Sequence, residues 1–277
     1  MSYSDGSPVE DAIAITNGSF SDQGNFCLVT QAGALYCGTN GMTNASPEIA
    51  SGVISVARLG IGGDYCAIAD NTLKCGSPGS PPTTSLSPSS NITSLGCYKE
   101  GCCAVLENGN LECTNGNQNL LSSLGEVTFF AGGDNNKCAV YADGSAFCDG
   151  ENWNGQLGLP GYEPQNQSNP AATFDEGMVA TACGQHSACW LSSDGTIWCS
   201  GAGSNEAGSG GGERSPTMIK DETGEVITNA VAITSGREFG CAALADGELK
   251  CWGFGSNTAQ SVDLGSEGVY MPNYCKE

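Results

Sequence analysis

Two cysteines bracket the stretch Cys189-Trp-Leu-Ser-Ser-Asp-Gly-Thr-Ile-Trp-Cys199, whose apolar residues alternate on both sides of a turn. The three-residue loop Ser193-Asp194-Gly195 has glycine at the left-handed position and places Cys189 directly opposite Cys199 on antiparallel strands. Directly opposed residues at a non-hydrogen-bonded position lie about 4.5 Å apart at Cα, so a disulfide can join them with little backbone movement. The stretch therefore predicts a β-hairpin closed by a disulfide.

The same unit occurs six times along the chain. Its bracketing cysteines are Cys27 and Cys37, Cys66 and Cys75, Cys103 and Cys113, Cys138 and Cys148, Cys189 and Cys199, and Cys241 and Cys251. The loop with glycine recurs as Gln31-Ala32-Gly33, Glu107-Asn108-Gly109, Ala142-Asp143-Gly144 and Ala245-Asp246-Gly247. The second unit is one residue shorter, but a two-residue Asp70-Asn71 turn again places its cysteines opposite each other. We therefore predict six cross-strand disulfides.

A further apolar run precedes each hairpin. These runs are Ala12–Ile15, Val53–Ala57, Ile92–Leu95, Val127–Ala131, Met178–Ala182 and Ala230–Ile233. Each unit thus offers at least three antiparallel strands, and no amphipathic helix separates one unit from the next. Short strands repeated at a period of roughly 35 to 50 residues predict an all-β propeller with one small sheet per blade. A β-sandwich would not explain the sixfold self-similarity.

Four segments carry a resemblance to a known family. They are Cys138-Ala-Val-Tyr-Ala-Asp-Gly144, Asn154-Gly-Gln-Leu-Gly158, Gly184-Gln-His-Ser-Ala-Cys189 and Cys241-Ala-Ala-Leu-Ala-Asp-Gly247. They resemble the repeat of the regulator of chromosome condensation family, which contains Ala-Gly-x-x-His, Cys-Ala-Leu, Asp-Gly, Cys-Trp-Gly and Asn-x-x-Gly-Gln-Leu-Gly. The resemblance covers about residues 9 to 255. It implies a β-propeller with four-stranded blades that is closed by pairing between the two chain ends.

The number of repeats predicts the number of blades. The nuclear member of the family, which exchanges nucleotide on a small GTPase, has seven blades, whereas this chain shows six repeats, so we expect six blades and keep seven as the alternative. Residues 1–277 are then one domain, in which Val262–Met271 would complete a blade begun near residue 9. The predicted repeats are 9–50, 51–90, 91–124, 125–175, 176–225 and 226–277.

The charge of the chain argues against a nuclear role. Nine basic residues stand against 30 acidic ones, which gives a formal net charge of −21. Such a chain repels nucleic-acid phosphate instead of supplying the cations that binding needs. We therefore expect no nucleic-acid partner, and the acidic surface favours basic partners.

The cysteine content indicates the compartment. Sixteen cysteines in 277 residues, mostly paired by geometry, indicate oxidising surroundings, so we expect a secreted or cell-surface protein. Outside the hairpins remain Cys97, Cys102, Cys183 and Cys275, with Cys102 and Cys103 interchangeable. We predict pairs Cys97–Cys102 and Cys183–Cys275. The alternative, a zinc site from these four with His186, does not have the spacing of a known zinc motif, so we expect no metal and no cofactor.

Four sequons support secretion if the source is eukaryotic. They begin at Asn17, Asn44, Asn91 and Asn166, in or beside predicted loops. No apolar run approaches 18 residues, so we expect no membrane span. The N-terminus lacks a charged start followed by an apolar core, which indicates that a signal peptide was removed or that Met1 was added.

The chain offers little for catalysis. Its single histidine, His186, stands in the family's repeat segment, where we expect structural hydrogen bonds. A Ser/His/Asp triad or a multi-histidine metal site would have to be built around that one residue. We therefore predict that the protein is not an enzyme.

We expect an extracellular binding or structural-interaction module whose partner is another extracellular protein or copies of itself. The candidate contact residues are Trp153, Tyr162, Trp190, Trp198 and Trp252. Trp190 and Trp198 oppose each other across one hairpin and could equally be a packing pair. The alternatives are a lectin that binds a glycan between blades and, third, a propeller hydrolase or lyase with converging carboxylates.

Overall fold

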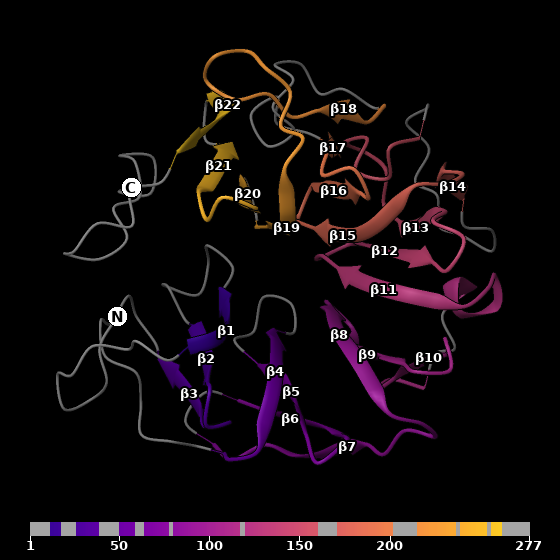
Figure 1. Ribbon diagram of the computed structural model, residues 1–277. Coiled ribbons are helices and arrows are strands. Elements are labelled where there is room, and N and C mark those ends of the chain that lie inside the picture. The colour runs from indigo at the N-terminus through magenta and orange to yellow at the C-terminus, as the bar shows by residue number, and fades with distance from the viewer. Residues whose placement is uncertain are drawn as a thin grey trace, which may run out of the picture. The chain divides into compact units, whose positions relative to one another are not determined.

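Figure 1 shows the computed structural model, whose described residues form β-strands and one short 3₁₀ helix. It describes residues 12–17, 26–38, 50–58, 64–77, 80–116, 120–159, 171–201, 215–236, 239–253 and 256–261. The chain forms two compact units, Met1–Ser122 and Ser123–Glu277, and each is treated by itself below. Among the described residues, no helix is long and apolar enough to cross a membrane.

The first unit contains three antiparallel sheets in chain order (Figure 1). Sheet 1 consists of β1 (Ala12–Asn17), β2 (Phe26–Thr30) and β3 (Leu35–Gly38). Sheet 2 consists of β4 (Val53–Arg58), β5 (Tyr65–Ala69), β6 (Thr72–Gly76) and β7 (Thr83–Leu86). Sheet 3 consists of β8 (Ile92–Tyr98), β9 (Gly101–Leu106) and β10 (Leu111–Cys113), after which the chain forms the 3₁₀ helix η2 (Leu120–Ser123).

The second unit contains three four-stranded antiparallel sheets. Sheet 4 consists of β11 (Val127–Gly132), β12 (Asn136–Tyr141), β13 (Ala146–Gly150) and β14 (Ala171–Phe174). Sheet 5 consists of β15 (Met178–Cys183), β16 (Ser187–Ser192), β17 (Ile197–Gly201) and β18 (Thr217–Met218). Sheet 6 consists of β19 (Ala230–Ser235), β20 (Phe239–Leu244), β21 (Leu249–Gly253) and β22 (Ser256–Ser261).

Six antiparallel sheets of three or four strands are the blades that the repeats predicted. The expectation of four strands is met in sheets 2, 4, 5 and 6. Sheets 1 and 3 have three strands among the described residues, and in sheet 1 an isolated bridge between Leu35 and Ala50 stands where a fourth strand would pair. The predicted final strand, Val262–Met271, lies outside the described residues.

The hairpin register is the predicted one. In all six sheets the bracketing cysteines are directly paired across the central two strands. Seven disulfides form among the described residues, each with its two Cα atoms 4.0 to 4.1 Å apart. Six are the hairpin disulfides and the seventh is Cys97–Cys102, which confirms these seven predicted pairs. Every one lies within a single sheet.

The hairpin turns join each sheet to the next within a unit. The carbonyl of the turn glycine accepts a hydrogen bond from the first residue of the next sheet, as in Met178 N to Gly144 O at 2.9 Å and Ala230 N to Gly195 O at 3.1 Å. The shorter turn of sheet 2 has no glycine. Its Asn71 side-chain oxygen accepts the equivalent bond from Ile92 N at 2.8 Å, so a side chain replaces the carbonyl.

Every first strand contains a β-bulge at its second residue, where the pairing register shifts by one. A bulge leaves one residue without a cross-strand partner. In sheets 2, 5 and 6 that residue is an exposed apolar one, namely Ile54, Val179 and Val231. In sheet 4 it is Thr128, whose hydroxyl donates to Val140 O at 3.1 Å. The bulge thus leaves the second residue of each first strand outside the cross-strand pairing.

The cores lie between neighbouring sheets of the same unit. In the first unit one cluster joins residues of sheets 1 and 2, and another joins sheets 2 and 3. In the second unit one cluster joins sheets 4 and 5, and another joins sheets 5 and 6. The hairpin cysteines contribute to all four clusters, so the disulfides are also core side chains.

Candidate interaction surface

The loop after β13 holds a tryptophan in solvent. Trp153 is 57% exposed, although its neighbour Asn152 is almost fully buried. The Asn152 side chain accepts from Leu157 N at 3.0 Å and donates to Leu159 O at 3.3 Å, which fixes the curve of the loop. Because aromatic side chains on fixed backbones dominate many binding surfaces, Trp153 is the strongest contact residue of the predicted set.

The same loop explains the single histidine. Asn154 Nδ2 lies 3.2 Å from His186 Nδ1, so the histidine ring joins the loop to the segment that leads into β16. This contact fits the structural role expected for His186.

The other predicted contact residues lie elsewhere. Trp190 is fully buried and Trp252 is 2% exposed, so the prediction that they are surface contact residues was wrong. Trp198 is half-buried, pairs with Trp190 across the hairpin, and packs against Phe174 with ring centroids 5.9 Å apart. The cross-strand pairing and the ring contact support the packing alternative for the Trp190 and Trp198 pair. Tyr162 lies outside the described residues.

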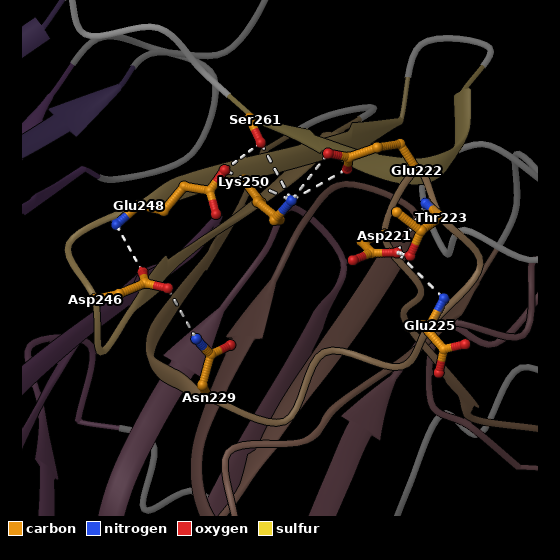
Figure 2. Close-up of polar contacts among 9 residues, drawn as sticks. All are labelled: Asp221, Glu222, Thr223, Glu225, Asn229, Asp246, Glu248, Lys250 and Ser261. Atoms are coloured by element: carbon orange, nitrogen blue, oxygen red, sulfur yellow. Dashed lines mark hydrogen bonds and ion pairs between the residues drawn. The ribbon is translucent and has the colours of Figure 1, made fainter.

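Sheet 6 presents an acidic network centred on one lysine (Figure 2). Lys250 Nζ lies 3.1 Å from Glu222 Oε2, 3.6 Å from Glu248 Oε1 and 3.2 Å from Ser261 Oγ. Burial lowers the pKa of Lys250, but its hydrogen bond and ion pairs with the glutamates outweigh burial and raise the pKa above its ordinary value. The lysine is therefore a fixed cation that ties the 221–225 loop to β21.

The loop around Asp221 turns tightly beside that lysine. Asp221 Oδ1 accepts hydrogen bonds from Thr223 N at 2.9 Å and Thr223 Oγ1 at 2.6 Å, as Figure 2 shows. The carboxylates of Glu222 and Glu248 pair with Lys250, and Asp221 lies in the adjacent loop (Figure 2). Sequence reasoning did not single out these residues, because the contact joins loops that are distant in the chain and no local motif marks it.

The carboxylates with shifted pKa values are all held ionised. Hydrogen bonds from Ser145, Ser192 and Thr223 lower the pKa of Asp143, Asp194 and Asp221. A backbone hydrogen bond, then Lys250, lowers the pKa of Glu222. A general acid at neutral pH needs a raised pKa, so these four groups are suited to binding cations and not to donating protons.

The remaining cysteines do not form the zinc site considered above. The Sγ atoms of Cys66, Cys97 and Cys102 lie within 4.8 Å of one another, but all three belong to disulfides and have no thiolate to offer. Cys183 is buried and has no disulfide partner among the described residues, and burial raises its pKa to about 12. Its predicted partner, Cys275, lies outside those residues, so that pair stays a prediction.

The sequons remain predictions. Asn91 is exposed, and its side-chain amide donates to Glu107 Oε2 at 3.0 Å. Asn17 is the last residue of β1. Asn44 and Asn166 lie outside the described residues.

Comparisons with solved structures identify the fold. Prp20p of Saccharomyces cerevisiae, the yeast RCC1 protein, is 14% identical with a TM-score of 0.67, over 90% of this chain and 76% of that chain. Human WBSCR16 is 14% identical with a TM-score of 0.69, over 96% of this chain and 83% of its own.

The CRINKLY WD40 ectodomain of the Arabidopsis thaliana receptor kinase ACR4 is 18% identical with a TM-score of 0.57, over 90% of this chain and 82% of its own. No family model and no curated protein matches the sequence. The chain therefore has the RCC1-type β-propeller fold that its repeats predicted, while identities this low leave its activity open.

Proposed function

We propose that this disulfide-rich propeller is an extracellular binding module without catalytic activity. Its partner is another extracellular protein or further copies of itself. The carrying observation is the Trp153 loop, in which buried amide hydrogen bonds hold a large aromatic side chain 57% exposed. Because the loop is already held by these hydrogen bonds, binding a partner costs little conformational entropy there. The contact with Trp153 therefore contributes more of its free energy to affinity.

Two further observations support this proposal. Seven disulfides within the described residues are typical of proteins that work in oxidising surroundings. Among the similar structures, one is a receptor-kinase ectodomain, and Prp20p is described by its binding to Gsp1p and histones. Protein binding is thus in keeping with Prp20p, and a place at the cell surface is in keeping with the receptor-kinase ectodomain.

The test begins with the oxidised protein from its natural source, measured by native mass spectrometry without reducing agent. A co-purifying protein or a homopolymer is then titrated against Trp153→Ala. We expect affinity to fall about tenfold or more, the usual effect of truncating a central aromatic contact. Met218→Ala is the matched control, because Met218 is also an exposed apolar side chain in the second unit, at 42%.

Equal affinities for the two variants would contradict the role of Trp153. A monomer that captures no protein but binds a glycan on an array would replace the proposal with the lectin alternative.

A further inference from the structure

Sheet 4 contains a hollow of about 430 Å³ beside its hairpin turn. Its lining includes Leu124 and Glu126 before β11, Tyr141 at the end of β12, Asp143 in the turn, Phe147 on β13 and Asp175 after β14. All of these residues belong to the second unit. None of them was singled out as a contact residue from the sequence, because three separate stretches of the chain, 124–126, 141–147 and residue 175, contribute to the hollow.

The apolar part of the hollow is aromatic. The Tyr141 and Phe147 rings pack edge to face, with centroids 5.5 Å apart and an interplanar angle of 86°. Tyr141 is buried, Phe147 is half-buried, and Leu124 is 44% exposed at the rim. Leu124 and Phe147 thus give the hollow an apolar surface, which lies beside the buried ring of Tyr141.

This surface is particular to sheet 4. The residue that pairs with the first residue of each first strand is Tyr141 here, and in the other sheets it is Thr30, Ala69, Leu106, Ser192 or Leu244. The repeat scaffold does not require an aromatic residue at this position. The aromatic floor is therefore a local feature of one blade.

The rim of the hollow is acidic. Glu126, Asp143 and Asp175 are exposed carboxylates, and no lysine, arginine or histidine lines the hollow. The ion pairs described for the second unit use Lys137 with Asp149 and Lys250 with Glu222 and Glu248, so these rim carboxylates have no cationic partner among the described residues. Ser145 donates to Asp143 through its N at 2.9 Å and its Oγ at 2.6 Å, which fixes that carboxylate in the turn.

We propose that this hollow binds a lysine or arginine side chain of the protein partner, a step that rests on the function proposed above. The aliphatic stem lies on Tyr141, Phe147 and Leu124, and the cationic head faces Glu126, Asp143 and Asp175. Basic side chains combine an apolar stem with a charged head in this way, and a cation also interacts favourably with aromatic faces. A sugar would need donors as well as acceptors, whereas the charged groups of this rim only accept hydrogen bonds.

The direct test uses a defined probe, acetyl-Gly-Arg-Gly-Arg-Gly-amide, titrated into the isotopically labelled full chain at low salt and followed by NMR. We expect chemical-shift changes at Ala142 and Phe147. Binding should weaken when citrulline, which keeps the shape of arginine without its charge, replaces both arginines. Shift changes confined to the Asp221 to Glu225 loop, or equal binding of the citrulline peptide, would overturn the proposal.

Two charge-matched double variants separate the hollow from the overall acidity. Glu126→Gln with Asp175→Asn removes two rim carboxylates, and Glu176→Gln with Glu225→Gln removes two exposed carboxylates outside the hollow. Exposed ion pairs contribute modestly, so we expect the first double variant to weaken peptide binding about 3- to 30-fold. The second should change it less than about twofold. Equal losses would show non-specific attraction and overturn the proposal.

The natural partner distinguishes this inference from the proposed function. If a captured partner loses affinity for Trp153→Ala but not for the Glu126→Gln, Asp175→Asn variant, the binding function stands and the hollow is not its contact. If the rim variant also loses affinity, the hollow is part of the interface. If no partner is captured, the proposed function fails and the peptide titration alone decides the hollow.

Discussion

At the scale of single residues, the turn glycines combine a backbone requirement with a packing one. Gly195 has φ of +83°, and a Cβ built there would lie 2.4 Å from Thr228 O. Gly247 occupies the same place in sheet 6 with φ of +88°, but nothing lies within 4 Å of its Cβ position. An alanine substitution at Gly247 therefore tests backbone strain alone, whereas one at Gly195 also tests steric conflict with the next sheet.

We expect Gly247→Ala to lower the free energy of unfolding by about 1 kcal/mol, the cost of a left-handed alanine. Gly195→Ala should lower it by roughly 1 to 3 kcal/mol more, because the methyl group also displaces the neighbouring backbone. Guanidinium denaturation of both variants under non-reducing conditions measures the difference. Equal losses would show that the contact with Thr228 relaxes without cost.

Tyr65 predicts how stability responds to alkali. Its ring is fully buried, its hydroxyl donates to Ser80 O at 2.9 Å, and burial raises its pKa from 10.0 to about 12. Between these values the unfolded chain loses the phenol proton while the folded chain keeps it. The contribution of Tyr65 to stability is thus complete below pH 10 and is lost as the pH rises through 12.

The measurement is the free energy of unfolding at pH 8, 10 and 11, in a background with both Cys183→Ala and Cys275→Ala, which removes the two cysteines outside the seven described disulfides. We expect a decline above pH 10 that is shallower in Tyr65→Phe, although that variant loses a hydrogen bond worth about 1 kcal/mol at pH 8. The same slope with and without the hydroxyl would contradict the assignment.

For single residues, the features that could be predicted from the sequence are those that depend on nearby residues in the chain. The cysteine pairs were predictable because a hairpin fixes its register within about ten residues. The exposure of Trp190 and Trp252 was not, since it depends on the sheet packed against them, which no local pattern records. The sequence placed Asn71 in a turn but did not predict its hydrogen bond, because the donor to its side-chain oxygen is the backbone of the following sheet.

At the scale of elements, sheets 2 and 3 bring two disulfides together. Cys66 Sγ lies within 4.8 Å of both Cys97 Sγ and Cys102 Sγ, in one buried cluster. In Cys75→Ser, the freed Cys66 thiolate is positioned to attack either sulfur of Cys97–Cys102. The attack would form a disulfide from Cys66 to one of them and release the other as a thiol.

We expect non-reducing peptide mapping of Cys75→Ser to show a disulfide from Cys66 to Cys97 or Cys102. Cys251→Ser is the control, because Cys241 has no such cluster of cysteines among the described residues. It should retain its other disulfides unchanged. An intact Cys97–Cys102 bond beside a free Cys66 in Cys75→Ser would refute the expectation.

At the scale of the whole molecule, disulfides add to the stability that the buried clusters between sheets provide. Each hairpin disulfide closes a loop with a sequence separation of 9 or 10, which stabilises by about 3 kcal/mol in the chain-entropy model. Six such contributions exceed the net stability of an ordinary domain, about 5 to 15 kcal/mol. We therefore expect the fully reduced chain to be unfolded.

Near-ultraviolet circular dichroism and limited proteolysis after treatment with a phosphine reductant at neutral pH check this. Loss of the aromatic signal and rapid cleavage are the expected results, with the untreated protein as control. A reduced chain that keeps both its signal and its resistance would show that side-chain packing alone suffices.

The architecture as a whole was more predictable than the site. Repetition of one hairpin indicated the number of sheets, since each copy carries its own turn and cysteines. The hollow of sheet 4 could not be predicted, because residues as far apart as Leu124 and Asp175 meet only after folding.

Confinement of every described disulfide to a single sheet has a mechanical consequence. Neighbouring sheets are held to each other by hydrogen bonds and packing, so a stretching force yields first at these seams while each hairpin stays locked. Force cannot extend the residues between bracketing cysteines while the disulfides are intact. Across six hairpins, roughly 200 Å of extended chain therefore stays folded. Under load the six hairpins thus stay closed, whereas the outer strands carry no such cross-link among the described residues, except for β8, which Cys97–Cys102 joins to β9.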